Sequence, residues 1–332
     1  MKIPDLGRYG FAPADLPIVE KLQRAGAAPA CGEQRRRSGI REEQASPSLP
    51  AGDGGLDFRW PDVPGAVRSQ VARFVDAVTS TLAGNLLGIY LHGSLATGGF
   101  NPQRSDIDLL VVTGAAVMAE TKRCLVEMLL DLSGRPRPIE VSFLREADLI
   151  PWKHPTPYAL HFSESWRNRY EDELRSGTWV RWNEGARDDA DLAAHITVAR
   201  HRGIHLAGTP VREALPPVPW QHYLDSIVAD LRWAWEQAQR DPVYLTLNAC
   251  RVLAAVAEGQ VLSKTEAGVW ALGLLPEALR PVVRWALGEY RGAPAGSISP
   301  AEIEALFHHV MATASAWSNW PAAGLLDSGA LR

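Results

Sequence analysis

The feature that most constrains this chain is a pair of short apolar runs, each directly beside a short polar motif. The first run, 86–91, ends at a glycine turn. Eleven residues separate Ser94 from the triplet Asp106-Ile107-Asp108, which opens the second run. Short apolar runs bounded by turn residues are typical of buried strands. Alternate residues of a strand point to the same face, so Asp106 and Asp108 share a face while Ile107 points into the core. The sequence therefore predicts two buried strands that present paired carboxylates beside a glycine turn.

The residue types in this motif are those that a bound nucleoside triphosphate requires. Gly93 has no Cβ, so the backbone of the turn can approach a phosphate closely. Ser94 offers a hydroxyl, and the N–H groups at the start of a following helix offer further donors. Magnesium prefers oxygen ligands, usually one or two carboxylates together with phosphates of the substrate. The motif therefore predicts a Mg²⁺–triphosphate site in which Asp106 and Asp108 bind the metal.

A third acidic residue, Glu140, interrupts the apolar run 139–144, which predicts a third strand. A carboxylate in a buried strand requires a partner. If this strand lies beside the strand of Asp108, Glu140 reaches the same site, where it can bind the metal or take the proton from an attacking hydroxyl. We therefore expect Glu140, Asp106 and Asp108 to be the catalytic residues and to share the metal.

Helical patterns flank these strands. Apolar residues recur at helical spacing from about 67 to 78 and again over 115–132. Strands and helices that alternate within about 80 residues indicate a domain with a small sheet covered by helices.

From about residue 188 the pattern becomes helical throughout. Asp241-Pro242 combines an N-cap acid with proline at the first helical position, and Gly259 is a helix stop. Ser263 and Glu266 have the spacing of a capping box. The expected helices cover about 190–205, 219–238, 241–258, a segment from 263, 276–290 and 299–317.

We therefore expect an α+β chain of four segments. Residues 1–57 are predicted to form a disordered tail, because the stretch 25–55 is rich in small, polar and charged residues. Residues 58–187 are predicted to form an N-terminal catalytic domain with a small mixed sheet and flanking helices. Residues 188–322 are predicted to form an all-α helical bundle, followed by a tail at 323–332.

Charge and composition limit the partners and the compartment. The net charge of −4 gives no support to a nucleic-acid-binding surface, which is usually basic. Cys31, Cys124 and Cys250 are odd in number and form no CxxC pair, which favours free thiols in a reducing compartment. The sequence has neither an apolar run long enough to span a membrane nor a signal-peptide pattern at its start. We expect a cytoplasmic monomer that binds neither nucleic acid nor membrane.

The segments 92–94 and 106–112 resemble the nucleotidyltransferase superfamily typified by DNA polymerase beta. Further segments resemble one branch of it, the streptomycin/spectinomycin adenylyltransferases, and extend the resemblance over about residues 64–320. They are 138–141, 150–152, 162–166, 244–251, 263–271 and 289–290. The resemblance implies that AMP passes from ATP to a hydroxyl of an aminoglycoside-type antibiotic, with Mg²⁺ as cofactor, and that pyrophosphate leaves.

The resemblance also implies a role for each matching residue. Gly93, Ser94, Arg251, Lys264 and Tyr290 would bind the nucleotide; Trp166 and Asp241 would hold the aminoglycoside; Glu140 would be the base, with Asp106 and Asp108 at the metal. Local patterns agree with part of this assignment. Asp241, Tyr244, Asn248 and Arg251 fall within an arc of about 80° on one predicted helix. Lys264 starts a capped helix, where the helix dipole also favours a phosphate.

Two other functions are compatible with the same motifs. The acceptor could be a protein or another metabolite, which would make the chain a regulatory nucleotidyltransferase. The chain could also be a nucleotide-binding sensor without catalysis, although a sensor has no need of the base Glu140 beside the metal ligands. Labelled ATP, Mg²⁺ and a panel of drugs would discriminate among the three.

Overall fold

The computed structural model of this chain describes residues 60–293 and 296–318. The predicted tails at 1–57 and 323–332, together with Cys31, lie outside the described residues. Cys124 and Cys250 are free thiols. No helix among the described residues is both long enough and apolar enough to cross a membrane.

A five-stranded mixed sheet organises the first part of the chain, and its strand order is β5-β3-β2-β1-β7. The neighbours β2 and β3 are parallel, whereas the other pairs are antiparallel. The strands are β1 (Leu86–Leu91), β2 (Ile107–Thr113), β3 (Ile139–Arg145), β5 (Leu160–Phe162) and β7 (Ile204–Gly208). The three strands predicted from apolar runs are thus confirmed, and they are the central three of the sheet.

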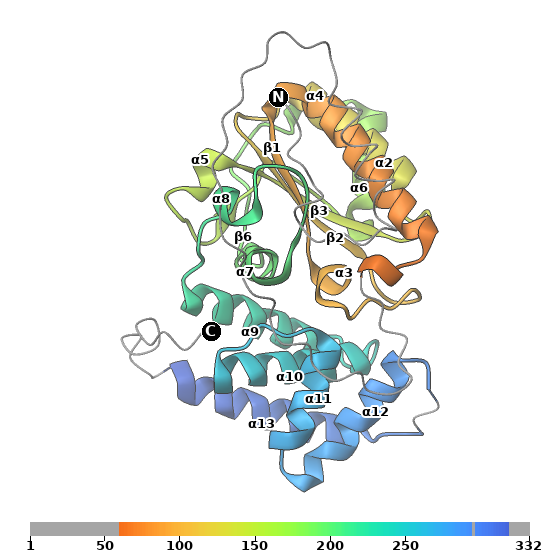
Figure 1. The fold of residues 1–332 in the computed structure, drawn as a ribbon, viewed down its shortest axis with the longest axis vertical. Helices are drawn as coiled ribbons and strands as arrows, with labels where there is room; N and C mark the ends of the chain where they lie inside the picture. Colours follow the sequence, from red (N-terminus) through yellow and green to blue (C-terminus); the bar gives the residue numbers. More distant parts are fainter. Residues whose placement is uncertain (1–59, 294–295, 319–332) are drawn as a thin grey trace, which may run out of the picture. The chain divides into compact units, whose positions relative to one another are not determined.

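Helices cover both faces of this sheet (Figure 1). The helices α2 (Gly65–Leu82), α4 (Ala119–Leu132) and α6 (Arg167–Ser176) lie on one side. The short helices α5 (Glu146–Leu149) and α8 (Val211–Ala214) lie with α7 (Leu192–Arg202) on the other side. There, Tyr90, Leu110 and Val112 from the strands share one buried cluster with Leu192 and Ile196 of α7. Helix α7 therefore packs directly on the sheet, beside strand β2, which begins next to Asp106 and contains Asp108.

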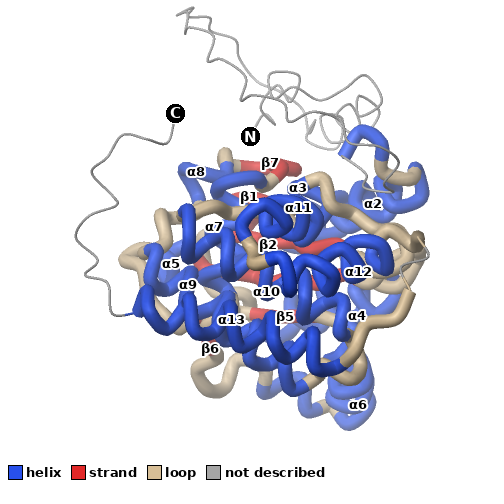
Figure 2. The backbone as a smooth tube through the Cα atoms, turned by 90° about the horizontal axis from the view of Figure 1, so that it is seen from below, coloured by secondary structure: helices blue, strands red, loops and turns tan. Residues whose placement is uncertain are grey.

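The second part of the chain is helical, and Figure 2 shows its helices in front of the strands. It comprises α9 (Trp220–Glu236), α10 (Pro242–Glu258), α11 (Lys264–Leu274), α12 (Arg280–Tyr290) and α13 (Pro300–Ser318). Helix α10 is buried along most of its length and supplies much of the core of this part. The predicted α+β class, with a small mixed sheet and a helical C-terminal part, is confirmed.

The predicted helix ends are confirmed in atomic detail. The Asp241 carboxylate accepts a hydrogen bond from the Tyr244 N–H at 2.9 Å, and Gly259 ends α10 with φ of +64°. Ser263 and Glu266 form the reciprocal capping box that starts α11. These caps fix the first turns of α10 and α11, the two turns that carry Asp241, Tyr244 and Lys264.

Some predicted boundaries differ from the structure. The helix predicted over 115–132 begins at Ala119, because Met118 has extended backbone angles and caps the helix. The helix predicted over 190–205 ends at Arg202, and the following residues pair with β1 as strand β7. The last turns before α12 form a separate 3₁₀ helix at Glu277–Leu279. Strand β7 belongs to the sheet of the first part of the chain, although it follows the predicted domain boundary at residue 188. The boundary between the two domains stays a prediction.

Candidate active site

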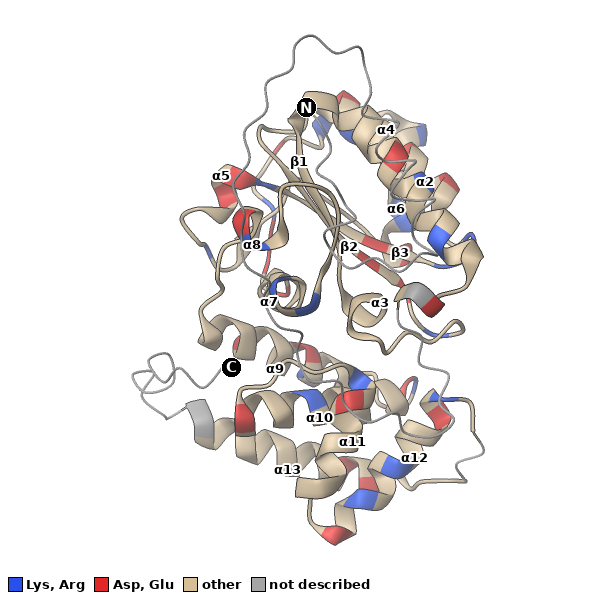
Figure 3. Ribbon diagram, in the orientation of Figure 1, with Lys and Arg blue, Asp and Glu red and all other residues tan. Residues whose placement is uncertain are grey.

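A cavity of about 400 Å³ is lined by residues at the start of β2 and by residues of α7, α9, α10 and α11. This volume is in the range of small-molecule sites. Figure 3 shows acidic residues on β2 and β3 and basic residues on α10 and α11. Of the ten site residues predicted from the sequence, the cavity lining includes Gly93, Ser94, Asp106, Asp108, Glu140, Asp241, Arg251, Lys264 and Tyr290.

The glycine turn at the start of α3 (Gly93–Thr97) packs tightly against β2. Gly93 has φ of +60°, and a Cβ added to it would lie 1.8 Å from Oδ2 of Asp108. The next backbone N–H, that of Ser94, donates to the Asp108 carboxylate. The hydroxyl of Ser94 is buried and has no hydrogen-bond partner among the described residues. A buried hydroxyl without a partner is costly, so this atom is available to donate to a phosphate oxygen.

The predicted catalytic carboxylates come together because β2 and β3 are parallel and in register. Asp108 lies directly opposite Glu140 in this pairing, so both side chains leave the sheet on the same face. Burial raises the pKa of Glu140 to about 7, with Asp108 adding to the shift and His195 opposing it. Burial, together with repulsion from Asp108, raises the pKa of Asp106 to about 6. The conditional prediction that the strand of Glu140 lies beside the strand of Asp108 is confirmed.

The carboxylates of Asp106 and Asp108 have the oxygen chemistry that a magnesium ion prefers. Asp106 and Asp108 are close enough for each charge to disfavour the other, and a divalent cation relieves that repulsion. No group of three His, Cys, Asp or Glu side chains among the described residues forms a ready metal cage. Magnesium commonly takes one or two carboxylates and completes its shell with phosphate and water. A role for Glu140 as third ligand stays a prediction.

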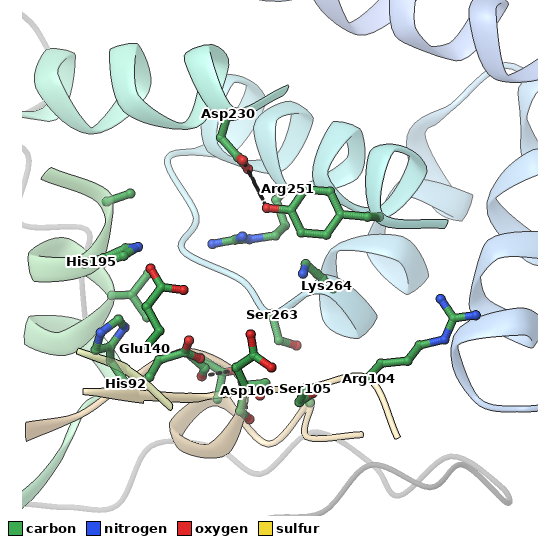
Figure 4. A pocket seen from close by; sticks show the side chains of 18 of the residues that line it. His92, Arg104, Ser105, Asp106, Glu140, His195, Asp230, Arg251, Ser263 and Lys264 are labelled. Carbon is green, nitrogen blue, oxygen red and sulfur yellow. Dashed lines mark hydrogen bonds between the residues drawn. The ribbon is translucent and has the colours of Figure 1, made fainter. Parts of the chain in front are cut away.

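Two cations face these carboxylates from the helical part (Figure 4). The Lys264 ammonium lies 4.0 Å from the centre of the Tyr244 ring, and burial lowers the pKa of Lys264 to about 8, helped by nearby Arg251. Arg251 donates to the Leu262 carbonyl at 3.2 Å and to the Asn248 side chain at 3.2 Å. Neither cation has an ion-pair partner among the described residues, so both charges remain available for an anionic ligand.

Tyr290 connects the helical part to the loop that precedes β2. Its hydroxyl donates to the Gly99 carbonyl at 2.9 Å and lies 3.3 Å from the Ser105 hydroxyl. The Asn101 amide donates to the Tyr290 carbonyl. Tyr290 thus fixes the loop beside the cavity, and the sequence prediction that it contacts the nucleotide stays a prediction.

The chain is similar to known proteins over most of its length. A model described as "Nucleotidyltransferase domain" matches residues 73–170, and one described as "Aminoglycoside adenylyltransferase, C-terminal domain" matches residues 213–313. An aminoglycoside (3'') (9) adenylyltransferase of Klebsiella pneumoniae is 32% identical over 256 residues, which cover 74% of this chain and 93% of that protein. The chain belongs to the aminoglycoside adenylyltransferase family. It is therefore a nucleotidyltransferase enzyme, as the sequence resemblance implies.

The chain is also similar to relatives at lower identity. A spectinomycin 9-adenylyltransferase of Campylobacter jejuni is 26% identical over 242 residues, covering 71% of this chain and 90% of that protein. The solved structure of a spectinomycin adenyltransferase from Enterococcus faecialis, with ATP and spectinomycin, matches with a TM-score of 0.63 at 21% identity. The match covers 75% of this chain and 99% of that one, so the two share the fold.

The two residues expected to hold the acceptor lie in different environments in this chain. Asp241 lines the cavity, but its carboxylate caps α10 and lies 3.8 Å from Arg104. Trp166 is outside the cavity lining. Its ring packs edge-on against His161, with ring centres 5.5 Å apart, and Arg169 stacks on it at 4.8 Å. A contact of Trp166 with the acceptor stays a prediction.

Several residues that line the cavity of this family member were not predicted from the sequence, among them His195 and Asp230. His195 of α7 forms an ion pair with Asp191, with 3.2 Å between Nε2 and Oδ2. Burial alone would lower the pKa of His195, but Asp191 raises it to about 10. Asp230 of α9 also lines the cavity. The only sequence feature that could have indicated them is polar character inside apolar helical runs, at His195 in 192–199 and at Asp230 in 227–231.

Proposed function

We propose that this chain transfers AMP from ATP to a hydroxyl of an aminoglycoside-type antibiotic, in a Mg²⁺-dependent reaction that releases pyrophosphate. The observation that carries the proposal is the register of β2 and β3, which puts Glu140 beside Asp108 in a cavity that Lys264 and Arg251 face. The relatives from Klebsiella pneumoniae and Campylobacter jejuni, named for their aminoglycoside and spectinomycin adenylyltransferase activities, support the reaction and the class of acceptor. The related fold solved with ATP and spectinomycin supports ATP as the nucleotide donor.

The proposed mechanism follows from the charges and donors in the cavity. The Ser94 hydroxyl, Lys264 and Arg251 hold the phosphates, and Glu140 takes the proton from the acceptor hydroxyl as its oxygen attacks the α-phosphorus. The bond between this phosphorus and the bridging oxygen breaks, and pyrophosphate leaves with the electron pair. Lys264 and Arg251 offset the negative charge that develops on the leaving group. Magnesium bound by Asp106 and Asp108 would supply further charge neutralisation.

The pKa of Glu140 suits a general base. A base is most effective when its pKa is close to the working pH, and burial raises the pKa of Glu140 to about 7. An ordinary surface glutamate has a pKa near 4.3 and is therefore a weaker base by more than two pKa units. In the proposed mechanism Glu140 is deprotonated when the acceptor binds.

The test of this function is an incubation of the full chain with labelled ATP and Mg²⁺ and with streptomycin, spectinomycin or no drug. Pyrophosphate release that requires both drug and Mg²⁺ is the expected result. Label transferred to protein would instead support a regulatory enzyme, and ATP binding without turnover would support a sensor. The monomeric state, the cytoplasmic location and the absence of nucleic-acid binding stay predictions.

A further inference from the structure

Asp230 is an acidic residue of α9 whose carboxylate lies at the cavity and is held in a fixed position. The Tyr244 hydroxyl donates to its two oxygens at 3.0 and 3.3 Å, and the Asn248 amide donates to Oδ2 at 3.0 Å. Figure 4 shows the carboxylate of Asp230 at the α9 side of the cavity, with Glu140 on the opposite, sheet side. Both donors come from α10, so the position of this carboxylate depends on the packing of two helices.

Both of these donors are neutral, so they fix the carboxylate without balancing its charge. No Lys, Arg or His of the described residues lies within ion-pair distance of Asp230. Burial raises the pKa of Asp230, and the nearby Asp191 adds to that shift. A carboxylate removed from water in this way is stabilised when a cation is placed against it.

The cations nearest to Asp230 have another ligand when the nucleotide is bound. Arg251 and Lys264 act on Asp230 from a distance in the free chain. In the proposed function both bind the phosphates of ATP, so their charges are offset by the triphosphate. The other acid close to Asp230, Asp191, already has His195 as its partner. Asp230 is then a cavity-lining carboxylate of α9 without a counter-charge.

The location of Asp230 places it on the acceptor side of the reaction. One turn earlier on α9, the Ser226 hydroxyl donates to Asp191 at 2.8 Å, which fixes α9 against the His195–Asp191 pair. That pair acts electrostatically on Glu140, the proposed base. Glu140 and Asp230 line the same cavity, so an acceptor whose hydroxyl reaches Glu140 has room to extend toward Asp230.

We propose that Asp230 binds an ammonium or guanidinium group of the acceptor and so selects cationic acceptors. This inference rests on the proposed function, because it takes ATP as the ligand of Lys264 and Arg251. Tyr244 and Asn248 hold the carboxylate so that it receives the cation without rearrangement. Oδ2 accepts from both Tyr244 and Asn248, whereas Oδ1 accepts from Tyr244 alone and keeps a lone pair for this contact.

The experiment compares spectinomycin with its N,N′-diacetyl derivative, whose amides are uncharged, in the full chain and in Asp230→Asn. Asparagine keeps the shape and can still accept hydrogen bonds from Tyr244 and Asn248, so the fold is expected to persist. The wild-type chain should have a lower KM for the cationic drug by roughly 10- to 100-fold, the range for a charged hydrogen bond. Asp230→Asn should lose this discrimination, while its KM for ATP stays within about twofold of the wild type.

The matched control is Asp225→Asn, the same substitution at an exposed position of the same helix, outside the cavity lining. It should leave both KM values unchanged. A raised KM for ATP in Asp230→Asn, with discrimination between the two drugs intact, would overturn the inference and make Asp230 a residue that positions Lys264 and Arg251. Absence of turnover with any drug in the wild type, despite ATP binding, would instead overturn the proposed function, so the two failures are distinguishable.

Discussion

The metal corner and the wall opposite it differ in how strongly local sequence determines them. The corner, defined here as residues 93–108 with Glu140, depends on one glycine turn and two adjacent strands. The wall, defined here as the cavity-facing residues of α7, α9 and α10 other than Arg251, is assembled by the packing of three helices against one another. In the proposed function the corner binds the metal and the triphosphate, whereas the wall contacts the acceptor. The comparison predicts that changes in the corner stop the reaction, while changes in the wall alter which acceptor is used.

The largest expected effect is that of Gly93→Ala. The new Cβ would meet Oδ2 of Asp108 at 1.8 Å, and alanine is strained at φ of +60°. Displacement of a metal-binding carboxylate by about 1 Å should lower kcat/KM at least roughly 100-fold. Drug-dependent pyrophosphate release measures this loss.

The control for this variant is Gly84→Ala, because a Cβ added to Gly84 meets no atom within 4 Å. Its kcat/KM and Tm should stay close to those of the wild type. Equal activity of the two variants would show that the turn tolerates a side chain and would remove the distinction between corner and wall.

A smaller effect is expected when the pH is raised. The pKa of Lys264 is lowered to about 8 by burial, so its ammonium loses its proton as the pH passes through this value. Binding of ATP phosphates requires the charged form, so the KM for ATP should rise above pH 8 by up to about tenfold per pH unit. Steady-state kinetics from pH 6.5 to 9.5 would measure this rise. Lys264→Arg stays charged throughout, so a rise of the same size in that variant would exclude Lys264 as its source.

The smallest effect is expected at Trp166. It lies outside the cavity lining and packs against His161, so Trp166→Ala should lower the Tm by a few degrees and change the KM for the drug by less than about threefold. Thermal unfolding and steady-state kinetics measure the two quantities. A tenfold rise in the drug KM would support the contact implied by the family resemblance and would extend the wall to this residue.

The extent to which sequence predicts this molecule follows the same division. Apolar runs and helix caps are local, so the three central strands and the start of α10 at Asp241 could be predicted. The pairing of β2 with β3 could be stated only as a condition, because strand order is not a local property. Strand β7 was missed because its five residues, Ile204–Gly208, carry no alternation and acquire their strand character by pairing with β1.

The site residues also fall into those that the sequence pattern predicts and those that only the packing of helices places at the cavity. Gly93 and Asp108 could be recognised because the reaction requires those residue types at that spacing. His195 and Asp230 could not, since a histidine or an aspartate in a helix is usually structural or solvated, and only the packing of α7 and α9 places them at the cavity. Asp241 could be predicted as a helix cap from local sequence, and its carboxylate is engaged in that cap.

The proposed role of the corner's carboxylates in transfer of AMP to a drug hydroxyl can be tested on the product itself. Mass analysis of spectinomycin after incubation with ATP, Mg²⁺ and either the wild-type chain or Asp108→Asn tests it most directly. The wild type should yield drug that is heavier by one AMP group, and the folded Asp108→Asn variant should yield none above the background without enzyme. Product from Asp108→Asn at the wild-type rate, or unmodified drug with the wild type, would contradict the claim.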